Sequence, residues 1–389
     1  MTLTRERLLQ DLYTAYFGAC RHKRKRSYVR RWERNLKENM EQLCDDLYLR
    51  RYRAMPSKCF IVDHPKKREV FCAAFRDRIV HHLYFDYTHE LFERTFIADS
   101  YSCIKGRGTH YGIRRIAQHI RQESQNYTRR CYALKLDIRG YFMHIDRRRL
   151  LDIALQTLQR KAKGLDLEFL EWLTREIAML DPTAGCIITG KAEEWQGLDP
   201  AKSMRNLPDG LGLPIGNLTS QLFSNVYLNT FDQFMKRTLG CKHYGRYVDD
   251  AVVVSCDREW LLSLVPRVKA FLQTEIGLQL HDGKLTITDV RQGVEFLGAY
   301  IRPWRIYTTN GTLRRIEKNM RSVDYRRRNS TARTVNSYIG IMQHTASYNQ
   351  RRRLFMRKEL LQIGRFNDDM TKFVVSKPRS VKWAKCEPS

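Results

Sequence analysis

A pair of acidic residues set between two runs of β-forming residues constrains this chain more than any other feature. The segment reads Gly245-Arg246-Tyr247-Val248-Asp249-Asp250-Ala251-Val252-Val253-Val254. β-Branched and aromatic residues favour strands, whereas carboxylates favour the turn that joins them. The pattern predicts a hairpin whose tip carries Asp249 and Asp250. An Asp-Asp pair without such flanks is more often an ordinary turn, so the flanking strands are what favours a functional pair.

A third acid stands at a comparable place earlier in the chain. Asp137 ends the apolar run Ala-Leu-Lys-Leu-Asp, so a strand over residues 131–136 would deliver its carboxylate where the chain turns. Carboxylate and phosphate oxygens are the ligands that Mg²⁺ prefers. Two such ions can activate an attacking hydroxyl and neutralise a leaving pyrophosphate. The three acids therefore predict nucleotidyl-transfer chemistry, with Asp137, Asp249 and Asp250 as catalytic metal ligands.

The charge of the chain indicates a polyanionic partner. Its 389 residues include 70 Lys and Arg against 42 Asp and Glu, which gives a net charge of +28. Residues 1–70 hold 18 basic and 9 acidic residues, and residues 301–389 hold 21 and 6. Single runs such as residues 21–26 are commonly solvated faces, but two basic flanks around a nearly neutral middle suggest two walls of a channel for phosphates. Nucleic acid is the favoured partner, with an anionic membrane surface as the weaker alternative.

Composition also excludes several classes of protein. A hydrophobic content of 42% supports a packed core and excludes global disorder. The first twenty residues carry charges inside their apolar stretch, and no window approaches 18 consecutive apolar residues, so neither a secretory signal nor a spanning helix is expected. Ten cysteines without a Cys-x-x-Cys pair are expected to be reduced thiols. We expect a cytoplasmic protein of two or three domains, or one multi-lobed fold.

The order of periodic segments predicts an α+β fold. Residues 131–136 and 252–255 have the apolar runs of buried strands, and residues 150–159 and 165–180 have helical periodicity. Residues 181–216 are rich in Gly, Pro and Asp, which predicts a long loop with short strands around residues 186–189.

These motifs resemble those of reverse transcriptases. Tyr247-Val248-Asp249-Asp250 is similar to the family's YxDD signature, and Asp137 with Phe142 five residues later is similar to its preceding acidic motif. Other blocks follow in the family's order: Lys67-Arg68-Glu69-Val70-Phe71 and the segment to Val80, Gly106-Arg107-Gly108-Thr109-His110, Gly283-Lys284, Val294-Glu295-Phe296-Leu297-Gly298, and Ser337-Tyr338-Ile339-Gly340 with Arg351-Arg352-Arg353. The resemblance covers nearly the whole chain.

The resemblance implies a role for each of these residues. Asp137, Asp249 and Asp250, with the backbone carbonyl of Ile138, would hold two Mg²⁺ ions, with Mn²⁺ as an alternative. The nucleotide would be contacted by Arg68, Arg78, Phe142, Ile215, Gly216, Gln221 and Lys284, and the template–primer by Phe296, Leu297, Gly298, Arg351, Arg352 and Arg353. Phe142 would exclude a 2′-hydroxyl, Arg68 and Arg78 would grip the triphosphate, and Lys284 would face the leaving pyrophosphate.

Simpler interpretations of these side chains stay open. Phe142 could be a core aromatic that follows a strand. Arg68 and Arg78 could form surface salt bridges with Glu69 or Asp77. Lys284 could be a solvated lysine in a turn.

One block narrows the family. Bacterial relatives commonly carry Gln-Gly-x-x-x-Ser-Pro beside the nucleotide, whereas this chain reads Ile215-Gly216-Asn217-Leu218-Thr219-Ser220-Gln221. This pattern is similar to the reverse transcriptases of diversity-generating retroelements, which copy a template-repeat RNA with errors concentrated at adenines for mutagenic retrohoming. Loss of the Gln amide would weaken discrimination between right and wrong pairs. Ordinary loop packing is the alternative explanation for Ile215 and Gln221.

The resemblance also implies the architecture and the partners. It implies a right-hand polymerase with basic N-terminal helices and fingers over residues 1–136, an antiparallel-sheet palm with the YVDD hairpin over 137–300, and a basic helical thumb over 301–389. Residues 150–211 would be associated with the fingers. The partners would be template RNA, primer or cDNA, dNTPs and a ring of a small basic accessory variability determinant protein. Residues 21–26 and the thumb are the candidate docking surfaces, in a bacterial or phage-encoded protein without membrane contact.

Two alternatives remain. One is a group II intron-like or other bacterial reverse transcriptase of ordinary fidelity; the maturase and endonuclease regions expected of intron enzymes have no room in a chain that ends soon after residues 372–385. The other is a non-catalytic RNA-binding scaffold, against which the presence of all three acids argues.

Overall fold

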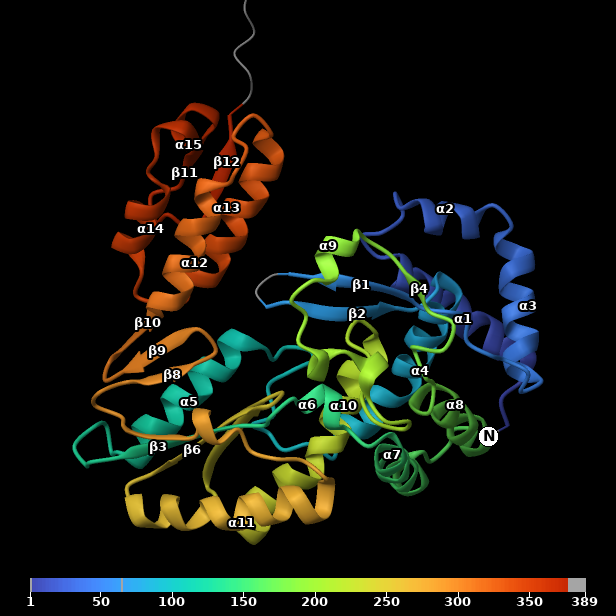
Figure 1. Cartoon of the computed structure of the whole chain (residues 1–389), viewed down its shortest axis with the longest axis horizontal. Helices are drawn as coiled ribbons and strands as arrows, with labels where there is room; N and C mark the ends of the chain where they lie inside the picture. The colour runs from blue at the N-terminus through green and yellow to red at the C-terminus, as the bar shows by residue number, and fades with distance from the viewer. Residues whose placement is uncertain (1, 64–65, 377–389) are drawn as a thin grey trace, which may run out of the picture. The chain divides into compact units, whose positions relative to one another are not determined.

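The computed structural model describes residues 2–63 and 66–376, and the chain within it forms two compact units (Figure 1). The first unit comprises the residues up to 116 together with 134–287, and the second comprises 117–133 and the residues from 288 onward. The chain therefore passes between the units several times. The predicted domain boundaries between residues 136 and 137 and between residues 300 and 301 stay predictions.

The first unit begins with three helices, α1 (Arg5–Cys20), α2 (Ser27–Glu33) and α3 (Leu36–Tyr48). Leu8, Leu12 and Tyr16 recur every fourth residue, so they share one buried face of α1, which packs against α4 (Phe75–Glu93). The hydroxyl of Thr4 accepts a hydrogen bond from the backbone N–H of Arg7 and caps α1. The basic run at residues 21–26 forms the exposed turn between α1 and α2.

A small sheet follows, in the order β2-β1-β4. β1 (Lys58–Val62) pairs with β2 (Arg68–Cys72) in antiparallel fashion and with β4 (Ile187–Ile188) in parallel. β4 lies in the predicted loop over residues 181–216, which otherwise holds the short helices α9 (Ala192–Trp195), η1 (Pro200–Lys202) and η2 (Met204–Asn206). The prediction of a long loop with a short strand near residues 186–189 is confirmed.

The central sheet has the strand order β5-β6-β3-β7. Its strands are β3 (Tyr132–Asp137), β5 (His243–Tyr247), β6 (Asp250–Ser255) and β7 (Thr286–Asp289). β5 and β6 form the predicted antiparallel hairpin, with Tyr247 paired to Asp250. This sheet brings the two predicted acidic motifs together, because β6 and β3 are neighbours.

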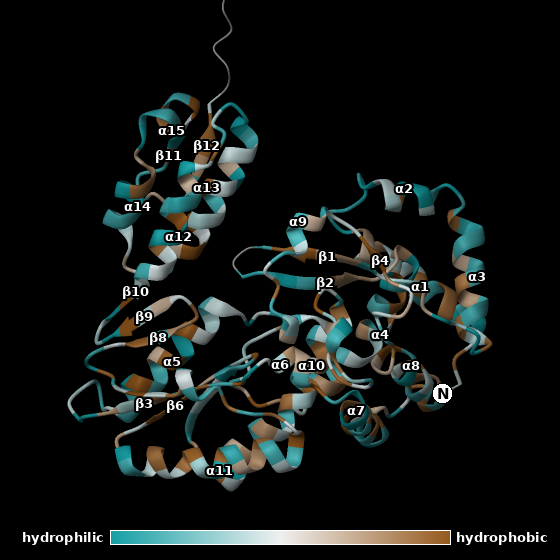
Figure 2. Cartoon of the chain, in the orientation of Figure 1, coloured by the Kyte–Doolittle hydropathy of each residue, from teal (hydrophilic) through white to brown (hydrophobic). Residues whose placement is uncertain are grey.

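Helices pack around these sheets. They are α5 (Thr109–Glu123), α6 (Tyr141–His144), α7 (Arg147–Lys161), α8 (Leu167–Ala178), α10 (Leu218–Gln233), the π-helical turn η3 (Phe234–Thr238), α11 (Arg258–Ile276) and the 3₁₀ turn η4 (Asp282–Lys284). The predicted helices over residues 150–159 and 165–180 correspond to α7 and α8. Hydrophilic and hydrophobic residues alternate along α11 (Figure 2), as expected of a helix with one buried face.

The second unit combines a three-stranded meander with a helical bundle. β8 (Val294–Phe296), β9 (Ala299–Arg302) and β10 (Arg305–Thr308) pair in order, and α12 (Asn310–Arg321), α13 (Arg328–Met342), α14 (Tyr348–Phe355) and α15 (Lys358–Ile363) follow. A hairpin of β11 (Gly364–Phe366) and β12 (Phe373–Val375) was not predicted. Ile316, Val335 and Phe355 are fully buried in the core of the bundle. The basic segment 372–385 lies outside the described residues after Ser376.

The structure bears on two predictions, one about membrane-spanning helices and one about the cysteines. In the described part of the chain, no helix is long and apolar enough to cross a membrane. The cysteines there are free thiols, as expected from their scattered spacing.

Gly216 offers a test of the local packing on the small sheet. Its φ is +128°, and an added Cβ would lie 2.5 Å from the carbonyl oxygen of Phe71 and 2.9 Å from Val70 Cγ1. We expect Gly216→Ala to lower the free energy of unfolding by about 1–3 kcal/mol, measured by urea denaturation. Gly340→Ala is the matched control, because that Cβ would meet nothing within 4 Å in helix α13 and alanine favours helices. Equal stability of the two variants would contradict the close approach.

Candidate functional site

The β5–β6 hairpin has a two-residue turn that carries the acidic pair. Val248 and Asp249 lie between the paired residues Tyr247 and Asp250. Val248 has a φ of +55°, which is unusual for a β-branched residue and must be held by its surroundings. Two hydrogen bonds hold it: Arg246 Nη1 donates to the Val248 carbonyl at 2.8 Å, and the Val248 N–H donates to Ser102 Oγ at 3.3 Å.

A buried ion pair anchors this hairpin to helix α10. Arg246 Nε and Nη2 donate to the two carboxylate oxygens of Asp232 at 2.7 and 2.6 Å, and the two side chains are only 1% and 0% exposed. The Tyr244 hydroxyl donates to the same carboxylate at 2.7 Å. This pair was not predicted from the sequence. The available signal was an arginine inside an apolar strand, because a buried arginine requires an acidic partner.

Asp137 is fixed at the end of β3 by the segment that carries Lys284. The His281 N–H donates to the Asp137 carbonyl at 2.8 Å, and the Arg139 N–H donates to the Gln279 carbonyl at 2.8 Å. This pairing places Lys284 Nζ 2.8 Å from each carboxylate oxygen of Asp137. Lys284 therefore lies at the acidic site, although here it contacts an acid and not a phosphate.

Two of the three acids have a raised pKa, and burial is the main cause. Burial raises the pKa of Asp249 to about 6, and the neighbouring charges of Asp250 and Asp137 act in the same direction. Burial also raises the pKa of Asp250, against the attraction of Lys135, whose Nζ lies 3.8 Å from Asp250 Oδ1. Three carboxylates with two lysines beside them are a site that favours additional positive charge.

The donor set suits a hard divalent cation, but the side chains are not gathered around one. Within the described ranges, no three Asp, Glu, His or Cys side chains form a cluster ready to hold a metal. Lys284 occupies the carboxylate of Asp137 instead. Because oxygen-only sites select Mg²⁺ or Mn²⁺, the residues fit such ions once Lys284 releases Asp137.

The loop after Asp137 joins the acidic site to the segment that contains Ile215. Ile138 is buried and bridges to Leu280. Phe142 is half-buried in α6, and its carbonyl accepts a hydrogen bond from the Leu213 N–H at 2.8 Å. Its ring lies 5.2 Å from that of Tyr141. Phe142 therefore lies beside Leu213, and its role at a nucleotide stays a prediction.

The segment at Ile215 forms part of the small sheet. The Phe71 N–H donates to the Ile215 carbonyl at 2.9 Å, and the half-buried Ile215 side chain packs against a core cluster that includes Met143 and Met204. Gly216 is exposed, and Gln221 is exposed in the first turn of α10. Ile215 thus has a packing role, and its contact with a nucleotide stays a prediction.

The two arginines predicted to bind triphosphate differ in environment. Arg68 is exposed at the start of β2. Its side chain has no hydrogen-bond or ion-pair partner among the described residues. Arg78 is half-buried, donates to the Ala73 carbonyl at 2.9 Å and stacks on Tyr28 at 4.8 Å.

The salt bridges considered as alternatives for these arginines are not formed. Glu69 instead accepts from Ser203 Oγ, the Met204 N–H and Arg205 Nε. Asp77 accepts from the Tyr52 hydroxyl and the Met55 N–H. Arg68 is therefore the arginine better placed to meet a phosphate.

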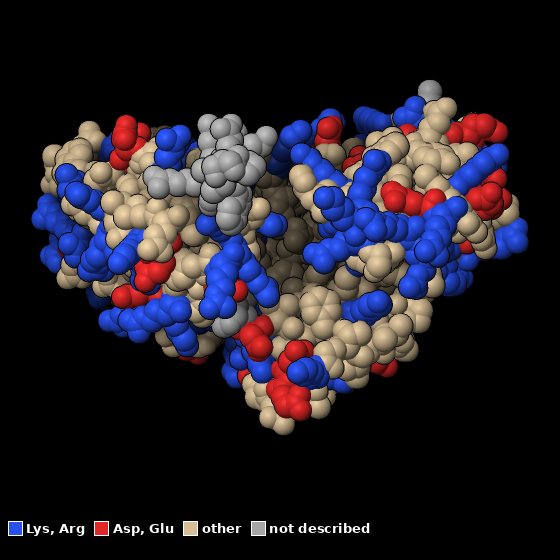
Figure 3. All heavy atoms as spheres, turned by 90° about the horizontal axis from the view of Figure 1, so that it is seen from above, with Lys and Arg blue, Asp and Glu red and all other residues tan. Residues whose placement is uncertain are grey.

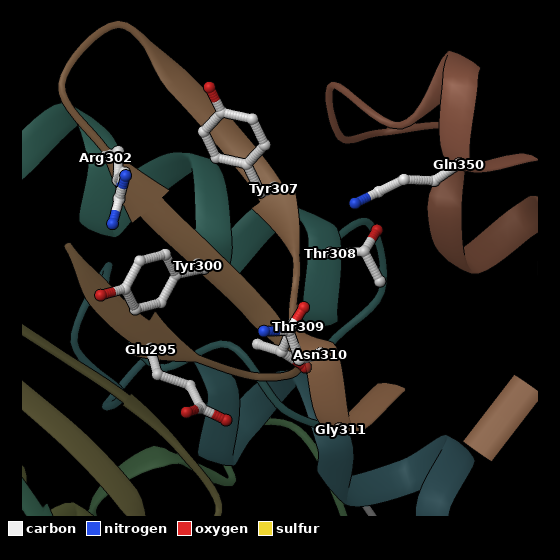
Figure 4. A pocket seen from close by; sticks show the side chains of 9 residues that line it. All are labelled: Glu295, Tyr300, Arg302, Tyr307, Thr308, Thr309, Asn310, Gly311 and Gln350. Carbon is white, nitrogen blue, oxygen red and sulfur yellow. The ribbon is translucent and has the colours of Figure 1, made fainter. Parts of the chain in front are cut away.

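The predicted primer-grip residues lie in the second unit. Phe296 is fully buried, whereas Leu297 and Gly298 form the turn between β8 and β9 with φ values of +51° and +78°. Beside them is a cavity of about 650 Å³ (Figure 4). Tyr300 and Arg302 line it from β9, Tyr307 from β10 and Gln350 from α14. The Phe296 ring is thus enclosed in the protein, and the role of this turn toward a primer stays a prediction.

The three predicted thumb arginines separate into two kinds. Arg351 is buried and donates to the Met342 carbonyl at 3.3 Å, to Ser347 Oγ at 3.0 Å and to the Asp369 carbonyl at 3.0 Å. Arg352 and Arg353 are exposed. Arg351 has a structural role inside the thumb, and only its two neighbours present their charge to solvent.

Comparison with known proteins decides the family. A family model described as reverse transcriptase (RNA-dependent DNA polymerase) matches residues 63–301, more than half of the chain. The chain belongs to the reverse transcriptase family. Among curated proteins, it is similar to Protein YkfC of Escherichia coli (strain K12), with 23% identity over 293 residues that cover 67% of this chain and 70% of the relative.

Telomerases are among the solved structures with a similar fold. This reverse transcriptase aligns with telomerase from Candida albicans, in complex with a TWJ fragment of telomeric RNA, with a TM-score of 0.45, 10% identity and coverage of 68% of this chain and 49% of the other. It aligns with apo telomerase from Candida tropicalis with a TM-score of 0.48, 9% identity and coverage of 74% and 52%. The chain thus spans about half the length of these telomerases, and the similarity is too distant to assign their activity.

Family membership confirms the central predictions. Family membership, the mixed α+β architecture and the antiparallel β5–β6 hairpin together confirm a right-hand polymerase fold. They also confirm an enzyme of the RNA-directed DNA polymerase class. The branch within the family, the individual roles of the site residues and the metal remain predictions.

The Arg246–Asp232 pair can be tested apart from its contribution to stability. Asp232→Asn leaves a buried arginine without its counter-charge and should lower the free energy of unfolding by about 3–5 kcal/mol. Arg246→Met/Asp232→Leu should recover most of that stability but leave the Val248 carbonyl without its donor. We therefore expect kcat for primer extension to stay about 10- to 100-fold below wild type in the double variant. Full activity would show that the pair serves only folding.

The raised pKa of Asp249 predicts how stability depends on pH in EDTA. Between about pH 4 and 6, the folded chain retains a proton that the unfolded chain has released, so this stabilisation is present below about pH 4 and is lost as the pH rises through about 6. Asp249→Asn should therefore be more stable than wild type by about 1–3 kcal/mol near pH 7.5 and equally stable near pH 4. Thermal unfolding measures both. Asp368→Asn, at an exposed position, controls for the loss of one negative charge.

Proposed function

We propose that this chain is the reverse transcriptase of a diversity-generating retroelement, which copies a template-repeat RNA into cDNA with errors concentrated at adenines. The arrangement of Asp137, Asp249 and Asp250 beside Lys284 supports the polymerase chemistry. The Ile215–Gln221 segment, joined to β2 and next to Phe142, supports the branch.

The three acids would hold two divalent metal ions together with the Ile138 carbonyl. When bound, such ions activate the primer hydroxyl and neutralise charge on pyrophosphate. The chain itself orients the acids through the Arg246–Asp232 pair and the Asp137–His281 hydrogen bond. Lys284, which must leave Asp137, would then be close enough to neutralise or protonate the leaving group.

The nucleotide would lie between the small sheet β2-β1-β4 and the acidic site. Arg68 is exposed for a triphosphate, and the half-buried Phe142 would exclude a 2′-hydroxyl from the sugar position. Arg352 and Arg353 would contact the template–primer backbone, since phosphate contacts need exposed cations. Template RNA, primer, dNTPs and a basic accessory protein ring are the proposed partners.

Primer extension on an RNA template followed by sequencing of the cDNA tests both parts of the proposal. We expect extension with Mg²⁺ and dNTPs, its loss in Asp249→Ala/Asp250→Ala, and errors clustered opposite template adenine. Ile215→Gln, which restores an amide beside the templating pair, should lower the error frequency at adenine by about tenfold.

Accurate extension by wild type would favour an intron-like enzyme of ordinary fidelity. An unchanged error spectrum in Ile215→Gln would assign Ile215 to the packing cluster alone. Absence of extension, repeated with the accessory protein and a long structured RNA, would contradict the polymerase itself.

A further inference from the structure

Helix α10 supports the turn with the acidic pair through a second side chain besides Asp232. Asn225 Nδ2 donates to the Ser102 carbonyl at 2.7 Å, and Asn225 Oδ1 accepts from Ser102 Oγ at 3.1 Å. Ser102 Oγ in turn accepts the N–H of Val248 at 3.3 Å. Asn225 and Asp232 lie about two helical turns apart, so they share one face of α10. That face therefore reaches the carbonyl of Val248 through Arg246 and its N–H through Ser102.

The segment that carries this serine, residues 99–102, is fastened along strand β5. The Arg246 N–H donates to the Asp99 carbonyl, and the Tyr101 N–H donates to the Arg246 carbonyl, both at 2.9 Å, which makes a parallel bridge. Because β5 is the outer strand in the order β5-β6-β3-β7, these bonds cover its free edge. The segment is therefore attached to the strand that leads into the turn.

Two buried side chains fix the segment in place. Arg115 of α5 donates from Nε and Nη2 to the two carboxylate oxygens of Asp99, at 2.8 and 3.2 Å. The ring of Tyr101 lies over Gly245, where an added Cβ would be only 2.6 Å from Tyr101 Cζ. Asp99 and Tyr101 are 4% and 0% exposed. Buried contacts thus determine the position of the Ser102 hydroxyl.

The hydroxyl acts on a residue in an unfavourable conformation. Val248 has a φ of +55°, which a β-branched residue adopts only where its surroundings hold it. Loss of the bond to its N–H would let the turn relax, and the next residue, Asp249, would change direction with it. A displacement of about 1 Å in a site can lower a rate by about 100-fold.

This support comes from neutral side chains. Figure 3 shows many Lys and Arg side chains on one face of the protein, whereas Ser102 and Asn225 carry no charge and are 0% and 1% exposed. They therefore hold the turn without adding charge beside the three acids.

We propose that Ser102, supported by Asn225, is a positioning residue of the polymerase. It holds the N–H of Val248 and thereby keeps Asp249 in the orientation in which the acidic pair acts. The inference rests on the RNA-directed DNA synthesis in the proposed function and is independent of the error spectrum. Loss of the hydroxyl should affect kcat more than KM for the dNTP, because the residues proposed to contact the nucleotide lie on other segments.

Single-nucleotide extension of a primer on an RNA template, with the dNTP concentration varied, tests this role. Below the thermal midpoint of unfolding, we expect Ser102→Ala to lower kcat about 10- to 30-fold and to leave KM for the dNTP within about twofold of wild type.

Ser124→Ala is the matched control. Ser124 is also 0% exposed, and its Oγ accepts a 2.9 Å hydrogen bond from the N–H of Tyr127, whose φ is +68°. That turn holds none of the predicted site residues, so kcat should stay within about twofold of wild type. Unchanged kcat in Ser102→Ala, or an equal loss in Ser124→Ala, would overturn the proposal.

Val248→Asn separates positioning from stability. Asparagine adopts positive φ more readily than valine, so the turn would need less support. In this background we expect Ser102→Ala to change kcat by no more than about threefold. Asn225→Ala should lower kcat as Ser102→Ala does, with the same dependence on residue 248. An undiminished loss in the Val248→Asn background would contradict positioning through φ.

Hydrogen–deuterium exchange of the turn gives a measurement that needs no activity. We expect amide exchange in the peptide over residues 247–250 to be at least about fivefold faster in Ser102→Ala than in wild type, and unchanged in Ser124→Ala. If wild type extends no primer, the proposed function fails, and this exchange decides the inference by itself. Equal exchange in wild type and Ser102→Ala would overturn it.

Discussion

The site depends on one buried ion pair. Arg246 would be an expensive residue to bury in a strand, but Asp232 accepts both of its guanidinium edges and makes the burial tolerable. The remaining N–H of the guanidinium reaches the Val248 carbonyl and thereby fixes a turn with positive φ. The acidic pair therefore lies in a strained turn. Asp232 of helix α10 fixes the conformation of this turn through Arg246. A purely apolar core could support the hairpin but could not orient that carbonyl.

The second constraint is electrostatic. Asp137, Asp249 and Asp250 are brought together by the strand order, and burial raises the pKa of Asp249 and of Asp250. Lys284 and Lys135 compensate part of this charge in the structure. The ammonium of Lys284 pairs with the carboxylate of Asp137 and is carried on a flexible side chain.

Much of the architecture could be predicted because the local sequence patterns favour the same helices and strands that the tertiary structure contains. The strand before Asp137, the hairpin at Asp249 and helices α7 and α8 have strong periodicity and clear turn residues, and each forms where expected. Arg351 shows the limit of such reasoning. It belongs to a run of three arginines that would all be expected at the surface. It is buried because its side of the helix faces the thumb core, where backbone carbonyls accept hydrogen bonds from its guanidinium group. The β11–β12 hairpin was missed because its strands are only three residues long.

The sequence by itself determined the chemistry: three acids at the ends of β-forming runs, a basic chain around them, and a substituted segment at Ile215. Each of these follows from residue type and local spacing. Only the tertiary structure decided which groups meet, because Asp232 and Arg246, or Lys284 and Asp137, are separated along the chain and are brought together by packing. Burial is a property of the folded chain, so the raised pKa of Asp249 could not be predicted from composition or spacing.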